Sequence, residues 1–176
     1  MRIFLIGMPG SGKSYWMQQL GALLQYDMID MDHYIEEREG CTIPQLFATG
    51  EHYFREKERA ALEAVVAQYP GNTVIATGGG APCYKDNLQQ MKAAGCVIYL
   101  ENDMEVLIAN VAQQGIDRPL LANGSGKELA EKLSGLYRKR KEIYEQAHLK
   151  IAADKASLST FAQAIEQYRS DHNLPL

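Results

Sequence analysis

Residues 2–14 read RIFLIGMPGSGKS, an apolar run followed by a glycine-rich turn that ends in a lysine and a serine. The unbroken apolar run over 2–6 is typical of a strand that is buried on both faces of a parallel sheet. Beyond the turn, residues 13–24 carry apolar side chains at helical spacing and predict an amphipathic helix. This strand–turn–helix unit predicts an α/β fold.

The turn itself, Gly7–Ser14, matches the pattern G-x-x-x-x-G-K-[ST] of a phosphate-binding loop, or P-loop. Its glycines let backbone N–H groups curl around phosphate oxygens, and the helix N-terminus adds its positive end. Lys13 reaches the β and γ phosphates in such loops, and the hydroxyl of Ser14 ligates Mg²⁺. A turn that merely links strand to helix is the alternative, but a chance match is on the order of one per cent. The pattern predicts a nucleotide site without naming the acceptor, since GTPases, ATPases and small-molecule kinases all carry it.

The rest of the chain alternates between predicted strands and helices. Strands are expected at 28–30, 73–76, 96–100 and 149–152, and helices at 33–39, 42–48, 51–68, 86–94, 103–114, 127–147 and 158–169. This alternation predicts a single domain over residues 1–176, in which a central parallel five-stranded sheet lies between two layers of helices. Residues 115–126, with three glycines and a proline, are interpreted as a mobile loop; a disordered linker is the alternative.

Composition argues against several classes of function. A chain of 176 residues with a net charge of −4 lacks the basic surface of a general nucleic-acid or anionic-membrane binder. Its three cysteines, Cys41, Cys83 and Cys96, form no C-x-x-C pair, which argues against a zinc or disulfide framework. The first apolar run is too short for a signal peptide or a membrane span. We therefore expect a cytoplasmic protein, and a monomer, because nothing in the sequence demands an oligomer.

Two carboxylates, Asp30 and Asp32, come at the end of the second predicted strand, where ligands bind in parallel sheets. Alternation along an extended backbone would send both side chains to the same side. One could then act through the waters of a metal ion while the other accepts a hydroxyl proton from the acceptor. The alternative is that Asp32 caps a helix that begins at His33.

Two further elements are candidates for the acceptor site. Arg55 and Glu58 share one face of the predicted helix 51–68, a pattern that alone more often indicates a surface ion pair. Gly78, Gly79 and Gly80 follow the predicted strand 73–76 and would let backbone amides approach a ligand closely. A simple strand-to-helix turn is the alternative for the three glycines.

In combination, these elements resemble the shikimate kinase family over nearly the whole chain. The matching segments stand in the order that the family has: GMPGSGKS (7–14), IDMD (29–32), IPQLF (43–47), GEHYFREKE (50–58), TGGG (77–80), RPLL (118–121) and RKEIYEQA (140–147). The resemblance implies a P-loop fold like that of nucleoside monophosphate kinases. It also implies transfer of phosphate from ATP, with Mg²⁺, to the 3-hydroxyl of shikimate, giving shikimate 3-phosphate and ADP.

The resemblance assigns residues to the nucleotide and to the metal. The nucleotide set is Gly10, Ser11, Gly12, Lys13, Ser14, Tyr15 and Arg118. Ser14 and Asp30 would hold Mg²⁺, with Asp30 acting through water. Arg118 would sit in a lid over about 115–126 and bridge substrate and phosphates while the closed lid excludes water.

The resemblance also assigns the acceptor side. Asp32 would bind the acceptor hydroxyl as the candidate base, and Lys13 and Arg118 would be the other catalytic groups. The remaining substrate-binding set is Arg55, Gly78, Gly79, Gly80 and Arg140. The two arginines would grip the carboxylate of shikimate, a task that suits the planar fork of guanidinium. Arg138 competes with Arg140, and the four-residue spacing from Arg140 to Tyr144 favours Arg140, as in the family.

One segment departs from the family pattern. Many shikimate kinases carry an arginine that packs against adenine in the helix before the lid, whereas residues 107–111 read LIANV. Adenine contacts are then expected elsewhere, for example from the backbone around 153–155, and a looser base preference is a hypothesis. Other hypotheses for the whole chain are a gluconate or nucleoside monophosphate kinase, or a nucleotide-binding module without turnover.

Overall fold

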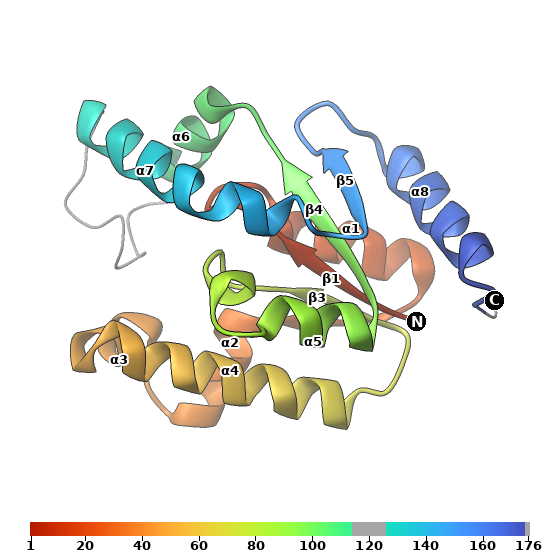
Figure 1. Ribbon diagram of the computed structural model, residues 1–176, viewed down its shortest axis with the longest axis horizontal. Helices are drawn as coiled ribbons and strands as arrows, with labels where there is room; N and C mark the ends of the chain where they lie inside the picture. The colour runs from red at the N-terminus through yellow and green to blue at the C-terminus, as the bar shows by residue number, and fades with distance from the viewer. Residues whose placement is uncertain (114–125, 175–176) are drawn as a thin grey trace.

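A parallel sheet of five strands forms the centre of the molecule (Figure 1). The computed structural model describes residues 1–113 and 126–174. In chain order the strands are β1 (Arg2–Ile6), β2 (Asp27–Asp30), β3 (Thr73–Ala76), β4 (Cys96–Glu101) and β5 (Leu149–Ala152). They lie in the order β2-β3-β1-β4-β5, and every neighbouring pair is parallel. The predicted five-stranded parallel sheet is confirmed.

Helices connect the strands and cover both faces of the sheet. They are α1 (Lys13–Leu24), α2 (Met31–Glu39), α3 (Ile43–Thr49), α4 (Glu51–Gln68), α5 (Asn87–Ala94), α6 (Met104–Gln113), α7 (Lys127–Tyr144) and α8 (Leu158–Asp171), with a 3-10 turn, η1 (Ala81–Cys83), after β3. The predicted bounds of the strand 2–6 and of the helices 13–24 and 51–68 are confirmed to the residue. The helix predicted over 127–147 ends earlier, at Tyr144.

Helix α2 begins two residues before the predicted start, and this changes the place of Asp32. Asp30, in extended conformation at the end of β2, is the N-cap, and its Oδ1 accepts a hydrogen bond of 3.1 Å from the backbone N–H of Asp32. A capping side chain bonds an N–H two or three residues ahead, so a cap at Asp30 puts Asp32 into the first turn. The extended-backbone argument and the capping alternative for Asp32 are therefore both wrong.

The two faces of the sheet bury separate apolar cores, because side chains alternate along each strand. Phe4 of β1 belongs to the core beneath α2, α4, α5 and α7, whereas Ile3 faces the core formed with α1 and α8. Trp16 is buried in the second core, and the centroid of its ring lies 4.2 Å from that of Phe161. Within the described ranges, none of the helices has the length and the apolar character that crossing a bilayer requires.

Arg2, at the start of β1, ties the ends of two helices to the sheet. Its guanidinium donates to the backbone carbonyls of Val66 at 2.7 Å, Tyr69 at 2.5 Å and Ala94 at 2.9 Å. These carbonyls belong to the C-terminal ends of α4 and α5, where helices leave acceptors without intrahelical partners. A cation there also complements the helix dipole. The guanidinium thus anchors α4, which carries Arg55.

Replacing Arg2 by methionine is expected to lower the free energy of unfolding by about 2–4 kcal/mol, because three charge-assisted hydrogen bonds are lost. Urea denaturation of the two proteins measures the difference. Arg38→Met is the matched control, since Arg38 is exposed and its Nε lies 3.9 Å from Oε1 of Glu39, at the limit of an ion pair. Equal losses in both variants would contradict the anchoring role of Arg2.

Candidate active site

Three candidate segments meet at one edge of the sheet. The phosphate-binding loop follows β1, Asp30 ends β2, and Gly78–Gly80 follow β3. Strands β2, β3 and β1 are direct neighbours in the sheet. The carboxyl edge of a parallel sheet is the usual place for ligands. The three segments therefore share one edge of the sheet.

The phosphate-binding loop has the backbone that an anion site requires. Gly10 and Gly12 are in left-handed conformation, with φ of +80° and +83°. The N-cap residue of α1 is Gly12, which has no side chain that could form a capping hydrogen bond. The first N–H groups of the helix are therefore not covered by a capping side chain. Lys13 is buried, and its Nζ lies 3.0 Å from the carbonyl oxygen of Gly7 and 2.9 Å from that of Met8. The lysine ammonium therefore lies directly over the loop.

Asp30 joins the phosphate-binding loop to the acceptor side. Its Oδ2 accepts a hydrogen bond of 2.5 Å from the hydroxyl of Ser14, while Oδ1 bonds the backbone of Asp32. A hydroxyl and a carboxylate are the oxygen ligands that Mg²⁺ prefers, and Mg²⁺ usually takes only one or two protein ligands beside phosphate and water. Within the described part of the chain, no group of three or more His, Cys, Asp or Glu could hold a metal ion. The pair Ser14 and Asp30 therefore fits Mg²⁺ bound together with a nucleotide.

The pair of Arg55 and Glu58 on α4 is buried, which corrects the surface ion pair that its spacing most often indicates. Arg55 is 7% exposed and Glu58 is 1% exposed, and Nη1 of the arginine lies 2.6 Å from Oε2 of the carboxylate. The guanidinium also lies over two aromatic rings, with its Cζ 5.6 Å from the ring centroid of Phe47 and 5.1 Å from that of Phe54. Burial raises the pKa of Glu58 above its ordinary value, and the neighbouring Arg55 opposes this. A buried ion pair whose carboxylate has a shifted pKa is a candidate for a functional site.

Each glycine of the turn Gly78–Gly80 leaves room for a charged side chain. A β-carbon placed on Gly78 would overlap Oε1 of Glu58 and lie 3.4 Å from Oδ1 of Asp32. On Gly80 it would overlap the guanidinium of Arg55. The glycines therefore bring Asp32, Glu58 and Arg55 against one short stretch of backbone, and of these three only Glu58 was not assigned to the acceptor site from the sequence.

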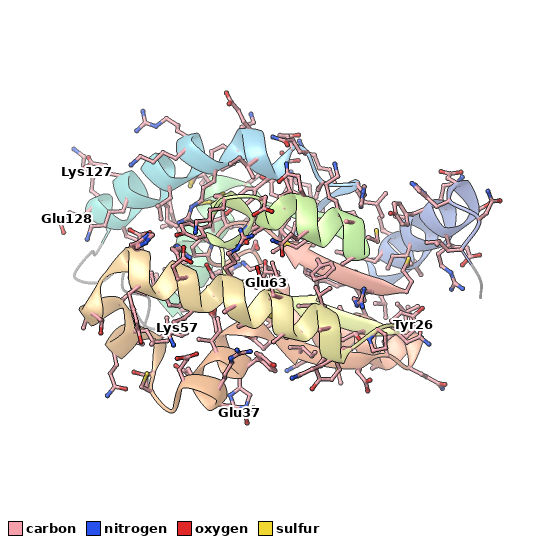
Figure 2. All side chains as sticks on the ribbon, turned by 60° about the horizontal axis from the view of Figure 1, so that its bottom comes forward. Tyr26, Glu37, Lys57, Glu63, Lys127 and Glu128 are labelled. Carbon is pink, nitrogen blue, oxygen red and sulfur yellow. The ribbon has the colours of Figure 1, made fainter. Side chains whose placement is uncertain are left out.

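The middle glycine, Gly79, is where the acceptor side meets the phosphate-binding loop. A β-carbon on Gly79 would lie 3.3 Å from Nη1 of Arg140 and 3.2 Å from the ring of Pro9. Arg140 is buried, whereas Arg138 is exposed, which agrees with the choice between them. Helices α4 and α7, which carry Arg55 and Arg140, lie on opposite sides of η1 in both views (Figures 1 and 2).

Two residues that were not assigned to the site hold it together. Tyr144 is fully buried, and its hydroxyl donates to the carbonyl of Gly79 at 2.5 Å. Asn110 of α6 donates from Nδ2 to the carbonyl of Gly10 at 2.8 Å. The spacing from Arg140 to Tyr144 was the only available signal for the tyrosine, because one turn of helix brings both side chains to the same face.

The remaining predicted residues are placed as follows. Ser11 is buried in the loop, and Tyr15 is largely exposed, with its ring 5.3 Å from that of Trp16. Arg118 and the lid expected over 115–126 lie outside the described residues, apart from Gly126 at the start of α7.

Comparison with known proteins identifies the family. A family model described as shikimate kinase matches residues 9–169. The chain belongs to the shikimate kinase family. A shikimate kinase of Clostridium botulinum (strain 657, Type Ba4) is 41% identical over 171 residues, which cover 95% of this chain and 97% of the relative.

Solved shikimate kinases have the same fold. The structure of the enzyme from Bacteroides thetaiotaomicron is 34% identical, with a TM-score of 0.85 and coverage of 99% of both chains. The shikimate kinase from Acinetobacter baumannii, solved in complex with shikimate, is 32% identical, with a TM-score of 0.85 over 99% of this chain and 95% of that one. The predicted family and the predicted P-loop kinase fold are confirmed.

Proposed function

We propose that this chain transfers the γ-phosphoryl group of ATP to the 3-hydroxyl of shikimate, giving shikimate 3-phosphate and ADP. One observation carries the proposal: Arg55 and Arg140, from separate helices, meet at the adjacent glycines Gly80 and Gly79, and Gly79 also lies against the phosphate-binding loop. A carboxylate held by both guanidiniums would place a small hydroxy acid beside the γ-phosphate. Membership of the shikimate kinase family and the shikimate complex of the relative from Acinetobacter baumannii support this acceptor.

The charges around the glycine turn favour an anionic acceptor. Arg55 is paired with Glu58 at 2.6 Å and with Glu51 at 3.4 Å. Among the described residues, no carboxylate lies within 4.0 Å of the buried guanidinium of Arg140. Burying a cation without an opposite charge is costly, so a substrate carboxylate there gains a strong, charge-assisted contact.

The nucleotide side of the proposal uses the phosphate-binding loop. The loop residues Gly10, Ser11 and Gly12 would surround the phosphates, with Lys13 at the β and γ positions. Bound with ATP, Mg²⁺ would neutralise phosphate charge, held by Ser14 and Asp30 directly or through water. Tyr15 would lie beside the nucleotide, and Arg118 would bridge substrate and phosphates from the lid.

In the proposed reaction Asp32 orients the 3-hydroxyl and takes up its proton. The hydroxyl oxygen forms a bond to the γ-phosphorus while the bond from that phosphorus to the β,γ-bridging oxygen breaks, and ADP leaves with this oxygen. Lys13 neutralises the charge that develops on the phosphates. Because all the proposed site residues belong to one chain, we propose that the protein acts as a monomer. We also propose that residues 1–176 form a single domain and that the protein acts in the cytoplasm.

The test is an acceptor panel. Purified protein is mixed with Mg-ATP and, in turn, with shikimate, gluconate, AMP or no acceptor, and release of ADP is followed. We expect release of ADP that depends on shikimate. Equal release without an acceptor, or a preference for gluconate or AMP, would overturn the proposal.

A further inference from the structure

Three carbonyls of the phosphate-binding loop are each held by a donor. Those of Gly7 and Met8 accept from Lys13, and that of Met8 also accepts from the backbone N–H of Ser11 at 3.1 Å. The carbonyl of Gly10 accepts from Nδ2 of Asn110 at 2.8 Å. Lys13 and Ser11 belong to the loop itself, whereas Asn110 comes from α6, a distant part of the chain. The last contact is therefore a tertiary restraint on the loop.

Helix α6 is seated on Gly10 itself. A β-carbon placed on Gly10 would lie 2.9 Å from the carbonyl oxygen of Leu107, 2.9 Å from Cγ2 of Val111 and 3.4 Å from Cβ of Asn110. The left-handed conformation of Gly10 and this close approach both require glycine. One turn of α6 thus packs against the backbone of the loop, with the amide of Asn110 over the Gly10 carbonyl.

Two hydrogen bonds together hold both ends of the peptide unit between Gly10 and Ser11. Asn110 holds its carbonyl, and the carbonyl of Met8 holds its N–H. An anion site depends on N–H groups that face the anion and on carbonyls that face away. A glycine peptide can rotate at small cost, so a carbonyl without a donor could turn toward the phosphates.

We propose that Asn110 is a positioning residue for the nucleotide: it keeps the Gly10 carbonyl turned away from the phosphates and so preorganises the loop before ATP binds. The inference rests on the proposed function, in which this loop binds ATP. The side chain of Asn110 bonds Gly10 of the phosphate-binding loop, whereas Asp32 lies against Gly78 on the acceptor side. Its effect therefore falls on nucleotide affinity and leaves acceptor affinity unchanged.

The experiment compares Asn110→Leu with the unaltered protein by calorimetric titration with ADP and by steady-state kinetics. Leucine keeps the volume and removes the donor. We expect the Kd for ADP and the KM for ATP to rise about 5- to 10-fold, as expected for one lost hydrogen bond, with the KM for shikimate changed less than about twofold. Asn110→Asp, which keeps the shape without the donor, is expected to weaken ADP binding at least as much.

Gln113→Leu is the matched control, because Gln113 is an exposed amide on the same helix. It should leave the Kd for ADP within about twofold of the original value. If Asn110→Leu lowers the melting temperature but leaves the Kd unchanged, or if Gln113→Leu weakens binding equally, the inference is wrong. If the unaltered protein does not bind ADP at all, the proposed function fails instead, so the two failures are distinguishable.

Discussion

Replacing Asp32 by asparagine is expected to lower kcat with shikimate by about 100- to 10,000-fold, the range that a positioned general base contributes. Asparagine keeps the shape of the side chain but cannot take up the hydroxyl proton. The Kd for ADP should stay within about twofold, because Asp32 lies on the acceptor side of Asp30 and does not belong to the phosphate-binding loop. Steady-state kinetics and calorimetric titration with ADP measure the two quantities.

The control for this substitution is Asp27→Asn. Asp27 is an exposed carboxylate at the opposite end of β2, so its loss removes the same charge far from the site. We expect its kcat to stay within about twofold of the original. A drop in kcat of less than about tenfold for Asp32→Asn would show that another group takes the proton.

Replacing Arg55 by methionine is expected to affect both acceptor binding and stability. The KM for shikimate should rise at least about 10-fold, because charge-assisted hydrogen bonds to the carboxylate are lost. The free energy of unfolding should fall by about 3–5 kcal/mol, because Glu58 is left as a buried carboxylate without its closest cation. Kinetics and urea denaturation give these two numbers separately.

A second substitution separates the two roles of Arg55. In Arg55→Met/Glu58→Gln the uncompensated charge is gone, so most of the lost stability should return while the KM for shikimate stays high. Arg59→Met is the control on the same helix: Arg59 pairs with Glu63 and Asp86 at the surface, so we expect a much smaller loss of stability than in Arg55→Met and an unchanged KM for shikimate. Recovery of the KM in the double variant would contradict the carboxylate clamp.

The stability lost in Arg55→Met should also depend on pH. Burial already raises the pKa of Glu58 above 4.5, and removal of Arg55 raises it further. Between pH 4.5 and the raised pKa the folded protein then binds more protons than the unfolded chain, so stability falls as the pH rises. The original protein has the same slope below its own raised pKa of Glu58, so the difference in stability should shrink only as the pH falls from the pKa of Glu58 in the variant to that in the original protein. A difference that is constant over the whole pH range would show that Glu58 is not its source.

How far the sequence predicts the site depends on how local each signal is. The loop Gly7–Ser14 was predicted correctly because its chemistry lies in consecutive residues between a strand and a helix. Asp32 was assigned to extended backbone because two carboxylates two residues apart suit either a strand or a helix start. The hydrogen bond from the Asp32 N–H to Oδ1 of Asp30 shows that Asp32 lies in the first turn of the helix. The order of residue types along the chain does not reveal this bond.

The sequence alone determined three things about this protein. It has a phosphate-binding loop near its start, its alternating strands and helices form a parallel sheet, and its resemblance to a family names an acceptor. The resemblance already assigned Arg55 and Arg140 to one carboxylate. Only the tertiary structure decided that they lie against Gly80 and Gly79, and that Asn110 holds the Gly10 carbonyl. The physical reason is that these contacts join residues far apart in the chain. Their geometry follows from how α4, α6 and α7 pack on the sheet, whereas periodicity and motif spacing report only on neighbours along the chain.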